Sequence, residues 1–248
     1  MLEGRKALVT GGGTGVGAAI ALALADAGAE VLICGRRAGP LEELSAQSVR
    51  IQSAKSDVTD EGDVVQLFAT HGPFDIVIAN AGSAQSAPLT KTSAELFQQM
   101  LSSNLTGTFL VFREAQKSLK GRDWGRFIAI ASTAGLKGYN YVSAYCAAKH
   151  GVVGLVRSAA LETAASGITV NALCPGFTET PMLEESIANI VEKTGGTEET
   201  ARAALAKTNP MGRLIQPEEV AAAALWLVGP GSDAVTGQAI SISGGETW

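Results

Sequence analysis

The sequence has few of the residues that build disulfide frameworks and metal centres. Its three cysteines, Cys34, Cys146 and Cys174, lie far apart and are odd in number, which argues against a disulfide framework or a zinc ribbon. The two histidines, His71 and His150, are too few for a histidine-based metal centre. We therefore expect free, buried thiols and no metal site.

Long apolar runs and dense basic stretches are also missing. No run approaches the ~20 apolar residues that cross a bilayer, and the charged start of the chain leads into a short apolar run, unlike a signal peptide. The net charge is -5, without a Lys/Arg stripe interleaved with aromatics, which argues against a nucleic-acid surface. These features predict a cytoplasmic protein that binds neither membranes nor nucleic acids.

Short apolar runs alternate along the chain with Ala/Leu-rich stretches of helical period. We expect strands at Lys6–Thr10, Glu30–Cys34, Asp75–Ala79, Arg126–Ser132, Thr169–Cys174 and Ala239–Ile242. We expect helices at Gly15–Ala27, Leu41–Ala46, Ala94–Ser103, Ser143–Ala165 and Pro217–Leu227. This alternation predicts an α/β fold with a doubly wound parallel sheet of about seven strands and helices on both faces.

The chain reads as a single domain over residues 1–248, because no linker or repeat divides its 248 residues and 46% of them are hydrophobic. One polar, glycine-containing region, residues 177–210, follows the strand Thr169–Cys174 and contains two short helical patterns. We call it the excursion. A segment of that length after the carboxyl end of a strand is typical of a lid or a specificity loop.

A glycine-rich turn, Thr10-Gly11-Gly12-Gly13-Thr14-Gly15-Val16-Gly17, joins the first strand to an Ala-rich helix. Glycine permits positive φ in a tight turn and lets the backbone and the helix N-terminus approach a pyrophosphate. The spacing is G-x-x-x-G-x-G rather than the common G-x-G-x-x-G. The turn predicts dinucleotide binding, although a tight turn also needs glycine for steric reasons alone.

Two arginines, Arg36 and Arg37, follow the second strand. A site for NAD would present an acidic residue there, about 20 residues after the glycines, to bind the ribose hydroxyls. Arginine instead matches a 2′-phosphate by charge and by its forked donors. The pair favours NADP(H), with NAD(H) still open and an exposed surface pair as the alternative interpretation.

Tyr145 and Lys149 are four residues apart near the start of a predicted helix, so their side chains share one face. A phenol with a pKa of ~10 is a poor base at neutral pH, and a nearby ammonium favours its ionised form. Ser132 ends a predicted strand at the ligand-binding edge of the sheet, where it can donate a hydrogen bond to a substrate oxygen. The Tyr–Lys spacing alone also arises by chance.

Two asparagines add to this group. Asn80 directly follows the strand Asp75–Ala79 at the same edge, within Asn80-Ala81-Gly82. Asn104 falls inside an apolar helical pattern, where asparagine is unfavourable unless it forms a hydrogen bond. A functional role and a local helix kink are both open for Asn104.

Together these motifs make the chain resemble the short-chain dehydrogenase/reductase family over essentially its whole length. The matching motifs are Thr10-Gly11-x-x-x-Gly15-x-Gly17, Asp57-Val58, Asn80-Ala81-Gly82, Asn104, Ser132, Tyr145-x-x-x-Lys149 and Pro175-Gly176-x-x-x-Thr180. The resemblance implies a Rossmann-like fold and a catalytic group in which Tyr145 is the general acid/base and Ser132 orients the carbonyl. It also implies that Lys149 holds the nicotinamide ribose and lowers the tyrosine pKa, and that Asn104 holds a water in a proton relay.

The resemblance also implies a set of cofactor contacts, with Asp57 on the adenine, Asn80 along the cofactor and Thr180 at the carboxamide. The expected cofactor-binding residues are Gly11, Gly13, Thr14, Gly15, Val16, Gly17, Arg36, Arg37, Asp57, Val58, Asn80, Ala81, Gly82, Tyr145, Lys149, Pro175, Gly176, Thr178 and Thr180. Two positions depart from the family pattern. Ala79 stands where many relatives have a second asparagine, and Thr14 stands where NADP-binding relatives often have a basic residue, which leaves the arginine pair to carry that preference.

Three stretches, Tyr145–Gly154, Cys174–Met182 and Thr236-Gly237-Gln238, resemble polyketide ketoreductases and 3-hydroxybutyrate or 3-hydroxyacyl-CoA dehydrogenases. That likeness implies a 3-oxoacyl thioester or acid as substrate. Pro181 through Lys207 would then line its pocket, with Met182 and Leu183 as an apolar wall or as helix packing.

The family further implies a homotetramer assembled through the helices around Ser103–Leu119 and Ser143–Ala165. Two other functions stay open. One is an NAD-dependent dehydrogenase of another secondary alcohol. The other is a catalytically silent dinucleotide-binding regulator, which would be expected to lose the serine, tyrosine or lysine, whereas all three are present.

Overall fold

Seven parallel strands form the central sheet, in the order β3-β2-β1-β4-β5-β6-β7. The structure is a computed structural model that describes all residues 1–248. The strands are β1 (Lys6–Thr10), β2 (Glu30–Gly35), β3 (Ile51–Lys55), β4 (Ile76–Ala79), β5 (Gly125–Ile130), β6 (Ile168–Pro175) and β7 (Ala239–Ile242). Because the strand order reverses between β1 and β4, a crevice for a ligand opens at the carboxyl ends of these strands. This confirms the doubly wound α/β fold.

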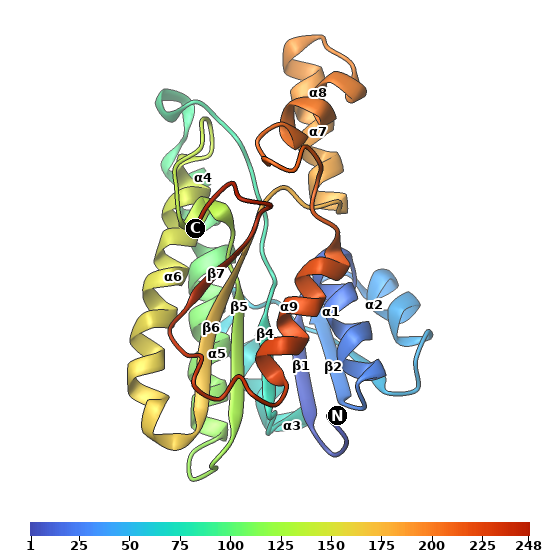
Figure 1. The fold of residues 1–248 in the computed structure, drawn as a ribbon, viewed down its shortest axis with the longest axis vertical. Coiled ribbons are helices and arrows are strands. Elements are labelled where there is room, and N and C mark those ends of the chain that lie inside the picture. The colour runs from blue at the N-terminus through green and yellow to red at the C-terminus, as the bar shows by residue number, and fades with distance from the viewer.

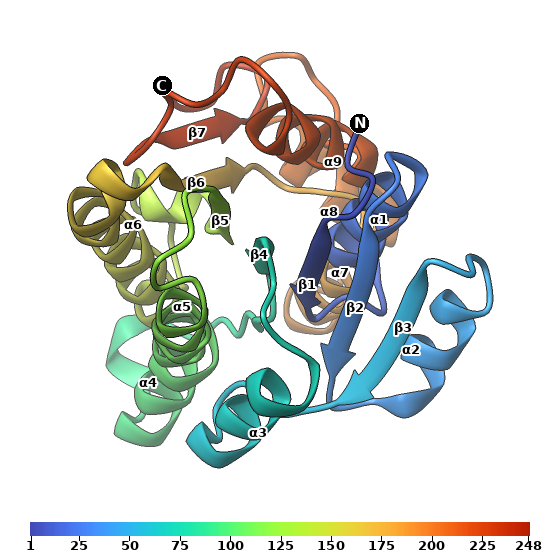
Figure 2. The same cartoon turned by 90° about the horizontal axis from the view of Figure 1, so that it is seen from below.

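Helices cover both faces of the sheet (Figure 2). On one face lie α1 (Gly15–Asp26), α2 (Ala38–Ser45) and α9 (Pro217–Val228). On the other lie α3 (Glu61–His71), α5 (Gly107–Ser118) and α6 (Ser143–Thr163), with α4 (Ala94–Leu101) packed on α6. Each face has its own apolar core, so the strands between them are buried on both sides, as β4 and β5 are along their whole length.

Two elements, β3 and α3, have no counterpart among the predicted ranges. β3 lies at the edge of the sheet and buries only its first residue fully, so it lacks the apolar run by which the other strands were found. The predicted helix Ala94–Ser103 is also different, since it ends at Leu101 and continues through a π-helical turn, Ser102–Thr106, into α5.

The excursion forms α7 (Pro181–Thr194) and α8 (Glu198–Ala206), the two helices expected there. In Figure 1 they stand beyond the carboxyl edge of the sheet, above α9 and α1. Leu183 and Ile187 of α7 pack with Ala201 and Leu214 in a small core of their own. The side chain of Leu183 is therefore used for packing, whereas Met182 is 38% exposed and free to face a pocket.

The three cysteines are buried and free. No group of His, Cys, Asp or Glu side chains is arranged to hold a metal ion. None of the helices has both the length and the apolar composition that spanning a bilayer requires.

Candidate active site

Tyr145 and Lys149 lie in the first turns of α6, on one face as their spacing predicted. The Lys149 ammonium is 5.6 Å from the centre of the Tyr145 ring. Its Nζ donates a hydrogen bond of 2.8 Å to the carbonyl oxygen of Ile130, the last residue of β5. This bond holds the start of α6 against the end of the strand that leads to Ser132.

Burial sets the protonation of both groups. It raises the pKa of Tyr145 to about 12, although a hydrogen bond with the Ser132 side chain acts in the opposite direction. Burial also lowers the pKa of Lys149 to about 8. The family resemblance implied a tyrosine pKa lowered by the lysine; here desolvation dominates, and the phenol keeps its proton at neutral pH. A protonated phenol is suited to give a proton to an oxygen.

Ser132 lies two residues beyond the end of β5 rather than inside the strand, as the N-cap of a short 3-10 turn, Thr133–Gly135 (η3). Its Oγ accepts a hydrogen bond of 3.1 Å from the backbone N–H of Ala134. This bond fixes the side chain and leaves the hydroxyl proton available to a ligand oxygen or to Tyr145.

Asn104 occupies the π-helical turn between α4 and α5 and is 1% exposed. Its amide donates to the carbonyl oxygens of Met100 at 3.0 Å and Ser83 at 2.9 Å. A Cβ added to Gly82 would lie 2.5 Å from Asn104 Oδ1 and 3.8 Å from Lys149 Nζ. Asn104 thus lies in a π-helical turn, and glycine at position 82 leaves open a space that both its amide oxygen and the Lys149 ammonium border.

The glycine turn connects β1 to α1 at the same edge. Gly11 and Gly15 have φ of 62 and 56, the left-handed region that favours glycine. Thr14, the N-cap of α1, makes no side-chain cap, so the first N–H groups of this helix remain available to an anion. The turn thus offers the backbone donors and the partial positive charge that a pyrophosphate requires.

Asn80 stabilises the glycine turn through side-chain hydrogen bonds. Its side-chain amide donates to the carbonyl oxygens of Thr10 at 2.9 Å and Gly11 at 3.0 Å, which uses both of its protons. A Cβ on Gly17 would lie 2.4 Å from Asn80 Nδ2. The resemblance placed Asn80 along the cofactor, whereas the structure engages its amide within the protein, as a brace of the turn.

The far end of the crevice carries the arginine pair. Arg36 and Arg37 are exposed directly after β2, and neither forms an ion pair. The pKa of Asp57 is lowered: burial raises it, but hydrogen bonds from the backbone and side chain of Thr59 and the charge of Arg36 outweigh that effect. The Asp57 carboxylate accepts from Thr59 N at 2.9 Å and Thr59 Oγ1 at 2.8 Å, so the unpaired positive charge lies next to a fixed carboxylate.

The excursion begins beside the glycine turn. A Cβ on Gly15 would lie 3.0 Å from the Thr180 methyl group. Thr180 caps α7 by accepting from Leu183 N at 3.3 Å and donates to the carbonyl oxygen of Thr178 at 3.1 Å. The structure thus brings residues after β6 to the residues after β1.

The predicted residues outside α6 and the π-helical turn lie at or just after the carboxyl ends of the strands. The predicted residues at the carboxyl edge are Gly11, Gly13, Thr14, Gly15, Val16, Gly17, Arg36, Arg37, Asp57, Val58, Asn80, Ala81, Gly82, Ser132, Pro175, Gly176, Thr178 and Thr180. Sequence reasoning missed Thr133, Lys137, Tyr139 and Glu246, which cluster next to Ser132.

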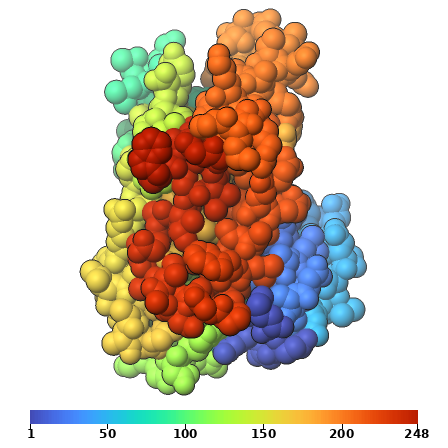
Figure 3. All heavy atoms as spheres, viewed as in Figure 1, coloured from blue at the N-terminus to red at the C-terminus, as the bar shows by residue number.

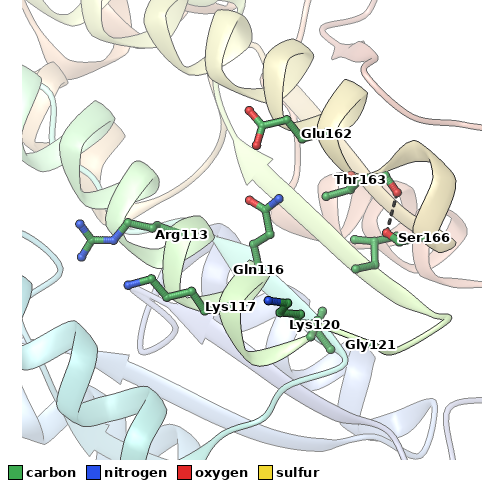
Figure 4. A pocket seen from close by; sticks show the side chains of 10 residues that line it. Arg113, Gln116, Lys117, Lys120, Gly121, Glu162, Thr163 and Ser166 are labelled. Atoms are coloured by element: carbon green, nitrogen blue, oxygen red, sulfur yellow. Dashed lines mark hydrogen bonds between the residues drawn. The ribbon is translucent and has the colours of Figure 1, made fainter.

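A cavity of about 400 Å³ lies elsewhere, between α5 and α6 (Figure 4). Lys117, Lys120, Glu162 and Ser166 are among its lining residues. Ile168, the first residue of β6, also lines it, which places it at the opposite end of the sheet from Ser132. It is not part of the candidate site.

Comparisons with known proteins agree with this geometry. A family model described as enoyl-(acyl carrier protein) reductase matches residues 11–247. A putative ketoacyl reductase of Streptomyces coelicolor is 38% identical over 252 residues, which cover 96% of this chain and 95% of the relative. A D-beta-hydroxybutyrate dehydrogenase of Cupriavidus necator is 35% identical, over 99% of this chain and 98% of the relative.

Two solved structures share the fold of this chain over nearly its whole length. A crystal structure of an actinorhodin polyketide ketoreductase variant with NADPH aligns at a TM-score of 0.91 and 36% identity, over 98% of this chain and 97% of that one. Levodione reductase aligns at a TM-score of 0.93 and 31% identity, over 99% and 98%. With its sheet order, its glycine turn and its serine, tyrosine and lysine in place, the chain belongs to the short-chain dehydrogenase/reductase family.

Proposed function

We propose that the protein is an NADPH-dependent reductase of 3-oxoacyl compounds, which converts their ketone into a secondary alcohol. The observation that carries the proposal is the cluster of Ser132, Tyr145 and Lys149 at the carboxyl edge, beside the glycine turn. Interconversion of a ketone and a secondary alcohol is the reaction of its relatives, which include ketoacyl reductases and hydroxybutyrate dehydrogenases.

The side chains suit reduction of a carbonyl group. The Ser132 hydroxyl donates a hydrogen bond to the carbonyl oxygen and holds it next to Tyr145. As negative charge develops on that oxygen, Tyr145 Oη transfers its proton to it. NADPH, when bound over the glycine turn, supplies the hydride that the carbonyl carbon accepts. We assign to Asn104 and Lys149, which both border the space beside Gly82, the relay of a proton from solvent back to the phenolate.

The preference for NADPH over NADH rests on the arginine pair. Arg36 and Arg37 are exposed, form no ion pair, and stand where an acid would repel a 2′-phosphate. A guanidinium group binds a phosphate through parallel N–H donors.

A homotetramer and a cytoplasmic location complete the proposal. The outer surfaces of α5 and α6 carry apolar side chains, with Phe109 43% and Leu161 84% exposed, which favours packing against another copy of the chain. The reaction also draws on the intracellular pool of reduced nicotinamide.

A second function, reduction of a carbon–carbon double bond, is favoured by the description of the matching family model. A single assay separates the two. The purified protein is given NADPH or NADH with a 3-oxoacyl thioester, a 2-enoyl thioester or a cyclic ketone, and nicotinamide absorbance is followed. We expect turnover of the 3-oxoacyl thioester with NADPH and at least tenfold less with NADH. Turnover of the enoyl thioester alone would overturn the proposal.

A further inference from the structure

The segment that follows β7, residues 243–248, folds back towards the catalytic edge. Gly244 and Gly245 turn the chain with φ of 60 and 93, and the hydroxyl groups of Ser241 and Thr247 hydrogen-bond at 2.6 Å. In Figure 3 the dark red end of the chain lies at the surface between the yellow-green segment before α6 and the orange segment before α9. The turn directs Glu246 inward.

Glu246 is a buried carboxylate that the reaction described above does not use. Its side chain is 2% exposed. Oε1 accepts a hydrogen bond of 2.6 Å from the Tyr139 hydroxyl and lies 3.0 Å from the ammonium of Lys137. Oε2 is enclosed and has no hydrogen-bond partner. Burying a carboxylate costs free energy unless it is paired, so the ion pair and the short bond to Tyr139 are what keep it there.

Tyr139 connects Glu246 to the turn that begins with Ser132. The Tyr139 hydroxyl lies 2.6 Å from Thr133 Oγ1 as well as 2.6 Å from Glu246 Oε1. A phenol has one proton, so it donates to the carboxylate and accepts from the threonine. Thr133 directly follows Ser132 in the 3-10 turn. A chain of hydrogen bonds thus joins the carboxylate to the residue next to the catalytic serine.

The Tyr139 ring also touches the excursion. It packs edge-on against Phe177, with 5.9 Å between ring centres and an angle of 82°. Phe177 is the first residue of the excursion. The position of Tyr139 therefore affects both the serine turn and the start of the excursion, of which the residues from Pro181 onward are proposed to line the substrate pocket.

We propose that Glu246 is a positioning and specificity-determining residue: it holds Tyr139 against the Ser132 turn and neutralises Lys137, so that this end of the pocket selects uncharged 3-oxoacyl esters over free 3-oxo acids. The inference rests on the proposed function and narrows its substrate class. With Glu246 and Lys137 paired, the two groups add no net charge beside the Ser132 turn. Removing either charge leaves the other unpaired and changes how a substrate carboxylate is received.

The charge part is tested with a matched pair of substrates, ethyl 3-oxobutanoate and free 3-oxobutanoate, both with NADPH. Glu246→Gln leaves Lys137 unpaired, and we expect the ester-to-acid ratio of kcat/KM to fall about fivefold. Lys137→Met leaves the carboxylate unpaired, and the ratio is expected to rise about fivefold. The KM for NADPH stays unchanged in both, and Glu218→Gln, the same substitution at an exposed residue of α9, changes nothing. Equal losses on both substrates in both variants would contradict the inference.

The positioning part is tested by hydrogen exchange of the peptide that spans residues 131–141, which requires no activity. We expect Glu246→Ala and Tyr139→Phe each to increase exchange there and to leave the glycine-turn peptide unchanged, with Glu246→Gln between them and the wild type. Unchanged hydrogen exchange of this peptide in both variants would refute the claim that Glu246 holds Tyr139 against the Ser132 turn. If the wild type binds NADPH but reduces neither ketone, the proposed function fails and the specificity claim falls with it, while the exchange result still decides the positioning claim.

Discussion

The Lys149 ammonium lies 5.6 Å from the centre of the Tyr145 ring, and its hydrogen bond to the carbonyl oxygen of Ile130 keeps it there. One buried cation thus lies between the Tyr145 ring and the end of β5. Since burial lowers the pKa of Lys149 to about 8 and raises that of Tyr145 to about 12, both groups are protonated at neutral pH.

The first prediction concerns pH. In the proposed mechanism, ketone reduction needs the Lys149 cation and the Tyr145 proton. Lys149 is charged below its pKa of about 8 and neutral above it, so we expect kcat for reduction to be constant at lower pH and to fall as pH rises through about 8. An arginine at this position stays charged to about pH 12. The residual kcat of the Lys149→Arg variant should therefore not fall as pH rises through about 8. The same fall in kcat above about pH 8 in both proteins would mean that a group other than Lys149 causes it.

The second prediction concerns Gly82. A methyl group there would lie 2.5 Å from Asn104 Oδ1 and near Lys149 Nζ. We expect Gly82→Ala to lower kcat at least tenfold, as steady-state kinetics at saturating NADPH would measure. Gly154→Ala, in α6, is the control, because a Cβ there meets nothing within 4 Å. Unchanged kcat in Gly82→Ala would show that the space beside Asn104 is not needed.

The third prediction separates bracing from cofactor contact at Asn80. Its amide holds the carbonyl oxygens of Thr10 and Gly11. Asn80→Ala should lower the free energy of unfolding by roughly 1–3 kcal/mol without any cofactor present, because two buried acceptors lose their donor. Denaturant unfolding of the cofactor-free protein measures this. If the variant is as stable as the wild type but binds NADPH weakly, the result would indicate that Asn80 contacts the cofactor directly.

The fourth prediction tests the cofactor preference. Replacing Arg36 and Arg37 together with alanine should raise the Kd for NADPH about tenfold or more and leave that for NADH nearly unchanged, since only NADPH carries the 2′-phosphate. Titrations at two salt concentrations provide the check, because an electrostatic contact weakens with salt. Equal losses for both cofactors would mean that the pair supports the fold instead.

The sequence predicted the parts of the fold that carry a strong local signal. β1 and β7 have the predicted bounds, because each is a short apolar or β-branched run with a turn on either side. β3 was missed because an edge strand exposes polar residues and loses the apolar pattern. The Tyr145–Lys149 pair was predictable because a helix fixes the relation of residues four apart.

The cluster around Glu246 had no such local signal. Glu246 and Tyr139 are 107 residues apart, and their contact depends on the turn at Gly244 and Gly245 after the last strand. The hydrogen bonds of Asn80 to the glycine turn were not predicted for a related reason, since nothing in the sequence tells whether an amide at a strand end faces a ligand or the neighbouring turn. For Glu246, the only hint in the sequence was an acidic residue after a glycine pair beyond the last strand.

The most direct test of the account is the replacement of Tyr145 with phenylalanine, which removes the proton and keeps the ring. With the preferred ketone and NADPH, we expect kcat to fall by at least about 10²-fold, the usual share of a general acid, while the Kd for NADPH stays within about twofold and the melting temperature is unchanged. A variant that binds NADPH and reduces the ketone at the wild-type rate would contradict the assignment of Tyr145 as the proton donor.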